Sequence, residues 1–133
     1  MPLAAYEDLS SFKLYFSDTG LFNSRLQLTK QSLAAARQYM GALTENYVAI
    51  QLKANGYKLN YWTSTATAEI DFVIVQNGEV VPIECKANIH VKSKSLDSFV
   101  KRYGIKQSIR LSMRNFGFEN NIKSVPLYAA FCV

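Results

Sequence analysis

The middle of the sequence contains three charged residues of the types that bind metal ions and stabilise anions. They are Asp71 in "AEIDFVIVQ", and Glu84 and Lys86 in "EVVPIECKA". Two carboxylates can hold Mg²⁺ or Mn²⁺, and the bound cation polarises a phosphate and acidifies a water molecule. A lysine ammonium beside them can hold that water or stabilise charge on a pentacovalent transition state. The set is therefore suited to cutting a phosphodiester bond, if the fold brings the three side chains together.

The two segments are joined by an Asn-Gly dipeptide at residues 77–78, the strongest short sequence signature of a two-residue hairpin turn. The register of such a hairpin places Asp71 directly opposite Glu84, in the class of pair whose side chains approach most closely. The same register sets Glu69 against Lys86. Opposed carboxylates destabilise a sheet by up to about 1 kcal/mol, and by more when desolvated, unless a proton or a cation lies between them. The hairpin therefore predicts a cation site. The alternative is that Lys86 merely bridges Glu69 and Glu84 across the strands and that Asp71 is solvated at a strand end.

Alternation along the hairpin predicts what covers it. One face is fully apolar, and the other combines valines with the charged residues. The apolar face carries Phe72, Ile74, Val81, Ile83 and Cys85. Because both faces are largely apolar, helices are expected above and below the sheet. The sequence thus predicts an α/β sandwich with a mixed sheet.

Further patterns predict the other elements. Helical spacing runs from about residue 32 to residue 55, where Gly56 provides a stop, and again over 95–104. Strand patterns appear at 57–63, 107–113 and 124–133. The N-terminal part is expected to hold a short aromatic strand within 11–17, a turn at "SDTG" and a short helix within 21–29.

Charge is distributed unevenly along the chain. Residues 1–85 contain six Lys or Arg and eight Asp or Glu, net −2, whereas residues 86–133 contain nine and two, net +7. A basic surface of this kind suits a polyanion such as DNA, although solvated basic faces are also common. The candidates for contacting a phosphate backbone are Lys92, Lys94, Lys101, Arg102 and Lys106.

Several classes of protein are excluded or disfavoured by composition. No apolar run approaches the roughly 18 residues of a membrane span, and the N-terminus lacks the pattern of a signal peptide. A cytoplasmic protein with no membrane partner is expected. The two cysteines have no metal-type spacing, so free thiols are expected, and the six glycines form no phosphate-binding loop.

The motifs together resemble a known superfamily. Asp71, then Glu84-x-Lys86 in the next strand, after a helix bearing Glu45, resembles the PD-(D/E)XK nucleases over about residues 38–112. More narrowly, "KLYFSDTGLF", "GALTENYVAIQL", "YWTSTATAEIDFVIV" and "VPIECKAN" resemble the C-terminal domain of unknown function of bacterial and archaeal AAA-type ATP-binding proteins. The resemblance implies a restriction-endonuclease-like αβββαβ core with helices on both faces of a mixed sheet.

The resemblance also implies roles for single residues. Asp71, Glu84 and Glu45 would be ligands of Mg²⁺ or Mn²⁺, and Lys86 would be the catalytic lysine. Ile70 stands where the superfamily's name has proline. Asp18, in "SDTG", matches the N-terminal motif, and capping or turn formation is its expected role.

Two functions remain open on this basis. The first is a metal-dependent endonuclease acting on DNA, and the second is an inactive nuclease-fold domain that mediates protein interaction or regulates an ATPase. The complete set of acids and lysine favours the first. The resemblance further implies an upstream AAA-type ATPase domain, with this chain as a C-terminal fragment. Its expected parts are an N-terminal extension at 1–37, a core at 38–112 and a C-terminal strand region at 113–133.

Overall fold

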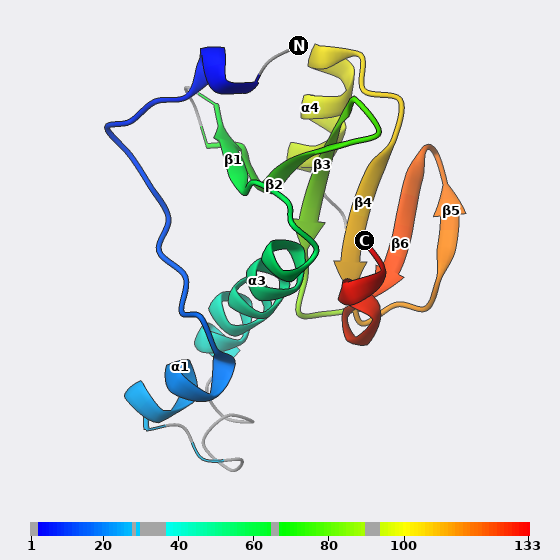
Figure 1. Cartoon of the computed structure of the whole chain (residues 1–133). Helices are drawn as coiled ribbons and strands as arrows, with labels where there is room; N and C mark the ends of the chain where they lie inside the picture. The colour runs from blue at the N-terminus through cyan, green and yellow to red at the C-terminus, as the bar shows by residue number, and fades with distance from the viewer. Residues whose placement is uncertain (1–2, 28, 30–36, 65–66, 90–93) are drawn as a thin grey trace.

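The structure is a computed structural model, and it describes all residues except 1–2, 28, 30–36, 65–66 and 90–93. Within the described residues, six strands form one mixed sheet in the order β1-β2-β3-β4-β6-β5 (Figure 1). The strands are β1 (Asn60–Thr63), β2 (Glu69–Gln76), β3 (Glu79–Cys85), β4 (Ser108–Ser112), β5 (Gly117–Glu119) and β6 (Ile122–Pro126). The helices are η1 (Leu3–Tyr6), α1 (Thr19–Arg25), α3 (Arg37–Ala54), α4 (Lys94–Tyr103) and η2 (Leu127–Cys132). The order from α3 to β4 is the predicted αβββαβ.

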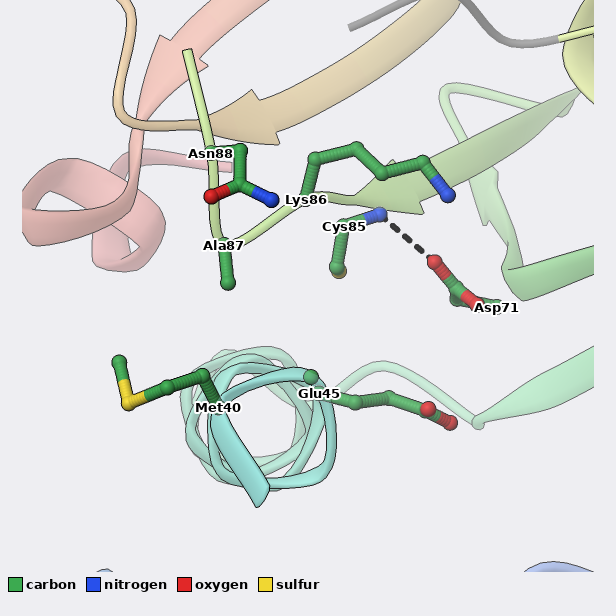
Figure 2. A pocket seen from close by; sticks show the side chains of 8 residues that line it. Met40, Glu45, Asp71, Cys85, Lys86, Ala87 and Asn88 are labelled. Atoms are coloured by element: carbon green, nitrogen blue, oxygen red, sulfur yellow. Dashed lines mark hydrogen bonds between the residues drawn. The ribbon is translucent and has the colours of Figure 1, made fainter. Parts of the chain in front are cut away.

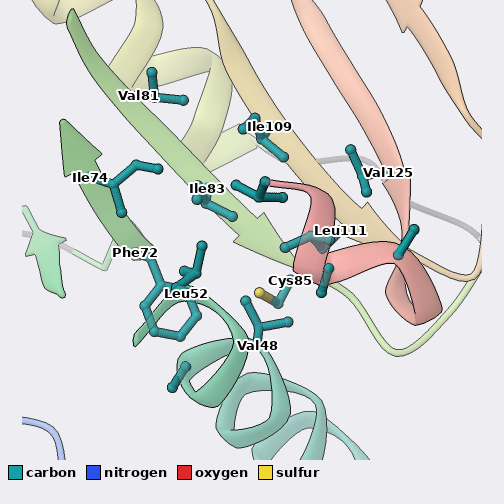
Figure 3. Packing of buried hydrophobic residues seen from close by; sticks show 14 residues of the cluster. Val48, Leu52, Phe72, Ile74, Val81, Ile83, Cys85, Ile109, Leu111 and Val125 are labelled. Atoms are coloured by element: carbon teal, nitrogen blue, oxygen red, sulfur yellow. The ribbon is translucent and has the colours of Figure 1, made fainter. Parts of the chain in front are cut away.

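Helices cover both faces of the sheet, which confirms the predicted fold class. On one face, α3 and η2 pack against alternate residues of β2, β3, β4 and β6 (Figure 3). On the other face, α4 packs through Leu96 and Phe99 on Ile70 and Val73 of β2. The predicted apolar face of the hairpin, from Phe72 and Ile74 to Cys85, lies in the α3 cluster.

The β2–β3 hairpin has the predicted turn and register. Asn77 and Gly78 have φ angles of 53° and 79°, and a two-residue turn of type I′ requires positive φ at both positions. The observed pairs are Gln76↔Glu79, Val75↔Val80, Ile74↔Val81, Val73↔Pro82 and Phe72↔Ile83. β3 then runs parallel to β4, and β4 parallel to β6, so the C-terminal ends of these three strands lie at one end of the sheet.

The register of β2 changes at Asp71. The pairs with β1 on either side of it are Asn60↔Val73 and Trp62↔Ile70. Asp71 and Phe72 therefore share Tyr61 as their opposite residue, which is the two-against-one arrangement of a β-bulge. As a result, Ile70 packs on the α4 face although Phe72, two residues later, packs on the α3 face.

This bulge overturns part of the predicted hairpin. The β2–β3 ladder ends at Phe72↔Ile83, and neither Asp71↔Glu84 nor Glu69↔Lys86 is among its pairs. The N–H of Cys85, which a continuing ladder would use next, instead donates to Oδ2 of Asp71 at 2.7 Å. The direct opposition of Asp71 and Glu84 was therefore predicted wrongly, because the alternation assumed an unbroken strand.

The ends of the chain differ more from expectation. Residues 11–17 form no strand, and the predicted strand at 124–133 ends at Pro126, where η2 begins. Asp18 does cap α1, since its Oδ1 accepts the N–H of Leu21 at 3.0 Å. The helix expected from residue 32 is observed from Arg37, and residues 30–36 lie outside the described part.

Gly56 ends α3 as predicted, with a φ of 82° and the N–H of Tyr57 donating to the carbonyl of Leu52 at 3.1 Å. Both cysteines are free. Within the described ranges, no helix is long and apolar enough to cross a membrane.

Candidate functional site

A pocket of about 660 Å³ lies at the C-terminal end of β3. Its lining residues are Met40, Gly41, Glu45, Asp71, Cys85, Lys86, Ala87 and Asn88. Figure 2 shows Glu45 extending from α3 on one side, with Asp71 and Lys86 on the sheet side. Three of the four predicted catalytic residues thus share one pocket.

Glu84, the fourth, is placed differently. It lies between Ile83 and Cys85, whose side chains face α3, so its own side chain leaves the strand on the opposite face. Glu84 is 4% exposed, and its Oε1 lies 2.7 Å from Nζ of Lys86. Burial is the largest single influence on Lys86 and disfavours its charged form. The hydrogen bond to Glu84, the charge of Glu84 and the charge of Asp71 together outweigh it and raise the lysine pKa above its ordinary value. Glu84 therefore holds the lysine rather than lining the pocket.

The carboxyl of Asp71 has a raised pKa. Burial raises the pKa of its carboxyl from the ordinary 3.8 to about 6, against the lowering effect of the Cys85 N–H bond. The negative charge of Glu45 adds to the increase, and the positive charge of Lys13 opposes it. The bulge at Asp71 produces this environment, because it turns the side chain toward α3 rather than toward the α4 face.

Glu45 is bound by two residues of the N-terminal segment, defined here as residues 11–18. Its Oε1 accepts hydrogen bonds from Nζ of Lys13 at 2.8 Å and from the hydroxyl of Tyr15 at 2.6 Å. Lys13 also forms a salt bridge with Glu69. Burial disfavours the lysine's charge, but Glu45 and Glu69 outweigh it and raise the pKa of Lys13.

Asn46, the neighbour of Glu45 on α3, anchors this segment. Its side chain accepts the N–H of Phe16 at 2.7 Å and donates to the carbonyl of Phe16 at 3.2 Å, as an adjacent strand would. The ring of Tyr15 also packs on Phe72, with centroids 5.7 Å apart. Because Lys13 and Tyr15 are two residues apart in an extended chain, both side chains point the same way, toward Glu45.

The three predicted metal ligands are not assembled into one cluster. Over the part of the chain that the structure describes, no group of three or more His, Cys, Asp or Glu residues could hold a metal ion. Glu45 and Asp71 remain as a pair of carboxylates on the same pocket. Mg²⁺ is commonly bound through one or two carboxylates together with water and substrate phosphates. The residues present therefore fit a Mg²⁺ or Mn²⁺ ion held by two acids, with Glu84 outside the set.

The predicted DNA-contacting residues are spread over the sheet. Lys94 begins α4 on the side where β3 ends, whereas Lys101 and Arg102 lie in the last turn of α4. Lys106 lies 2.7 Å from Glu79, the first residue of β3. The length of β3 separates this end from the pocket by about 20 Å, at a rise of about 3.3 Å per residue. Lys92 lies outside the described residues.

A further basic residue, which was not among the predicted DNA contacts, lies at the same end of the sheet as the pocket. Arg114 is exposed, follows the C-terminal end of β4, and donates from Nε to the carbonyl of Ile89 at 3.0 Å. Because β4 is parallel to β3, Arg114 lies at the pocket's end of the sheet, as Lys94 does. Its position depends on the parallel β3–β4 pairing, which residue types alone do not specify.

Residues 40–130 match the protein family described as "Domain of unknown function (DUF4143)". The chain belongs to this family. No curated protein and no solved structure matches the chain. The DUF4143 match contains Glu45, Asp71, Glu84 and Lys86, whereas the N-terminal segment precedes it.

Sequence reasoning missed Lys13 and Tyr15, which bind the glutamate of the DUF4143 domain from outside the matched range. Both are in the quoted stretch "KLYFSDTGLF", at alternate positions. That spacing shows only that the two side chains share one side of an extended chain. The spacing does not indicate that their partner is Glu45, which is 32 residues from Lys13 in the sequence.

Proposed function

We propose that this DUF4143 domain is a metal-dependent endonuclease-like domain that acts on DNA phosphodiester bonds and works attached to an AAA-type ATPase domain. One observation carries the proposal: Glu45, Asp71 and Lys86 reach one pocket from α3, from β2 and from the residue after β3. Two carboxylates and an ammonium group in a common pocket are the groups that metal-assisted phosphodiester cleavage uses.

Each residue has a part that follows from its surroundings. Mg²⁺ or Mn²⁺ bound by Glu45 and Asp71 would polarise the phosphate and lower the pKa of a bound water. Lys86, whose pKa is raised, is protonated at neutral pH and so stabilises negative charge on the phosphate rather than accepting a proton. Glu84 orients that ammonium group from 2.7 Å away.

One observation favours a second function, an inactive domain for protein interaction or regulation of the ATPase. Two of the acids already form salt bridges within the chain: Glu45 pairs with Lys13, and Glu84 pairs with Lys86. Internal ion pairs of this kind can stabilise a fold without any reaction. The two functions differ in one measurable property, which is cleavage of DNA.

The proposal predicts cleavage that requires a divalent cation. With Mg²⁺ or Mn²⁺, the protein should nick or cut at least one of four substrates: supercoiled, linear duplex, branched or single-stranded DNA. Chelator should abolish the reaction. Glu45→Gln removes a ligand charge at nearly constant shape, so the metal concentration for half-maximal rate should rise by about tenfold or more. Absence of cleavage on every substrate would favour the inactive domain.

DNA affinity should depend on charge near the pocket more than on charge far from it. Two double variants change the net charge equally but at opposite ends of the sheet. The first is Lys94→Glu with Arg114→Glu, and the second is Lys101→Glu with Arg102→Glu. In DNA-binding titrations at several salt concentrations, the first pair should reduce affinity and flatten the salt dependence more than the second. Equal effects of both pairs would indicate general attraction, and no effect of either would make the basic face a solvated surface.

A further inference from the structure

We infer that Lys13 is the internal counter-ion of the pocket acids, and that a divalent cation entering the site competes with its ammonium group for Glu45. The inference rests on the proposed function, because it takes Glu45 as a metal ligand. It adds a residue from outside the DUF4143 match and a role that opposes metal binding rather than supporting it.

The position of the ammonium group supports this role. Nζ of Lys13 lies 2.8 Å from Oε1 of Glu45 and also pairs with Glu69. It interacts with the charge of Asp71 as well, and it lies 5.3 Å from the ring centroid of Tyr61. One cation thus serves three carboxylates, and the lysine side chain is only 22% exposed. A divalent cation would be attracted to the same negative potential.

The segment that carries Lys13 is held independently of the lysine. Asn46 binds both backbone groups of Phe16, the ring of Tyr15 packs on Phe72, and Asp18 caps α1. The lysine side chain can therefore release Glu45 and stay paired with Glu69 while the segment remains docked on α3. A long flexible stem with a single compact charge is suited to such a shift.

Coulomb's law sets the size of the effect. A monovalent and a divalent cation about 6 Å apart repel each other in water strongly enough to change binding affinity about tenfold. Loss of the lysine charge should therefore strengthen metal binding, whereas loss of a positioning residue would weaken it. The sign of the change separates a counter-ion from a residue that merely holds Glu45 in place.

The test is Mn²⁺ binding without substrate, measured by titration calorimetry. Lys13→Met, which keeps the apolar stem and removes the charge, should bind Mn²⁺ about tenfold more tightly than wild type. Lys13→Arg keeps the charge and should match wild type. Lys58→Met removes a lysine that pairs with Glu7 at the exposed surface, and it serves as the control with no expected change.

A second readout is the melting temperature. In chelator, Lys13→Met should melt below wild type, because three carboxylates lose their cation, and saturating Mn²⁺ should raise its melting temperature more than that of wild type. If Lys13→Met does not fold, Lys13→Gln removes the same charge while keeping a donor toward Glu45. If wild type binds Mn²⁺ and the charge-removing variants bind it with equal or lower affinity, the counter-ion role is overturned and the proposed function is not. If neither wild type nor variant binds Mn²⁺, the proposed function fails and this inference fails with it.

Discussion

Lys86→Met is expected to lower the rate of Mn²⁺-dependent DNA cleavage by about a hundredfold or more, while Mn²⁺ affinity does not fall. The methionine keeps most of the stem volume but loses the ammonium group that Glu84 holds at the pocket. Because the two proposed ligands are Glu45 and Asp71, the metal should still bind. Rates measured under single-turnover conditions, together with Mn²⁺ titrations, separate the two effects.

The matched control for this variant is Lys106→Met. Lys106 pairs with Glu79 at the same N–O distance as Lys86 with Glu84, 2.7 Å, but at the opposite end of β3. Its loss should leave the cleavage rate unchanged within about twofold, since exposed pairs contribute little. Melting temperatures of both variants show whether they are folded. Wild-type activity in Lys86→Met would remove Lys86 from the mechanism.

Asp71→Asn is expected to melt at a higher temperature than wild type in chelator at pH 7.5 to 8. Because the folded protein holds the Asp71 pKa at about 6 against an ordinary 3.8, it binds a proton more readily than the unfolded chain does. This group therefore lowers the free energy of unfolding as pH rises through that range, by at most about 3 kcal/mol above pH 6. Asparagine carries no charge and can still accept the Cys85 N–H.

The advantage of the asparagine should shrink as pH falls from 7 toward 4, where the wild-type carboxyl becomes protonated in both states. Melting curves across this pH range in chelator measure it. Asp97→Asn, which changes an exposed aspartate of α4, is the control and should show no such pH-dependent gain.

In Mn²⁺, wild type should melt at a higher temperature than Asp71→Asn, the reverse of their order in chelator. An ion that binds only the folded state stabilises it by about 2.7 kcal/mol at a hundredfold excess over its dissociation constant. Wild type should gain this stabilisation in Mn²⁺ at neutral pH, whereas Asp71→Asn should gain little of it. A wild type that ignores Mn²⁺, with a variant that melts well below it in chelator, would make Asp71 a structural partner only.

Local patterns in the sequence predicted much of the fold. Residues 77–78 specify a turn that only a few residue types accept, and the register of five pairs followed from it. The bulge at Asp71 could not be predicted, since it depends on how β1 meets β2. β5 was also missed: its turn to β6 uses Asn120 and Asn121, whose positive φ angles are compatible with asparagine but not demanded by it.

The candidate site was predicted less completely than the fold. Residue types in the hairpin suggested Asp71 and Lys86, and the family resemblance added Glu45; the structure places all three on one pocket. The position of Glu84 differs from the prediction, since the bulge places Asp71 in the pocket beside α3 and Glu84 pairs with Lys86. Lys13 was missed because its partners come together only in the folded chain.

The adjacency of Glu45 and Asn46 on α3 has a thermodynamic consequence. Glu45 accepts hydrogen bonds from the side chains of Lys13 and Tyr15, and Asn46 bonds the backbone of Phe16. The N-terminal segment therefore docks on the same turn of α3 that supplies a carboxylate to the pocket. Binding equilibria that share a residue are linked, and the linkage is reciprocal. A ligand that contacts Glu45 in the pocket therefore changes the bonds that Lys13 and Tyr15 make to it, and so changes how firmly the segment docks; tension on the segment changes the affinity of that ligand in turn.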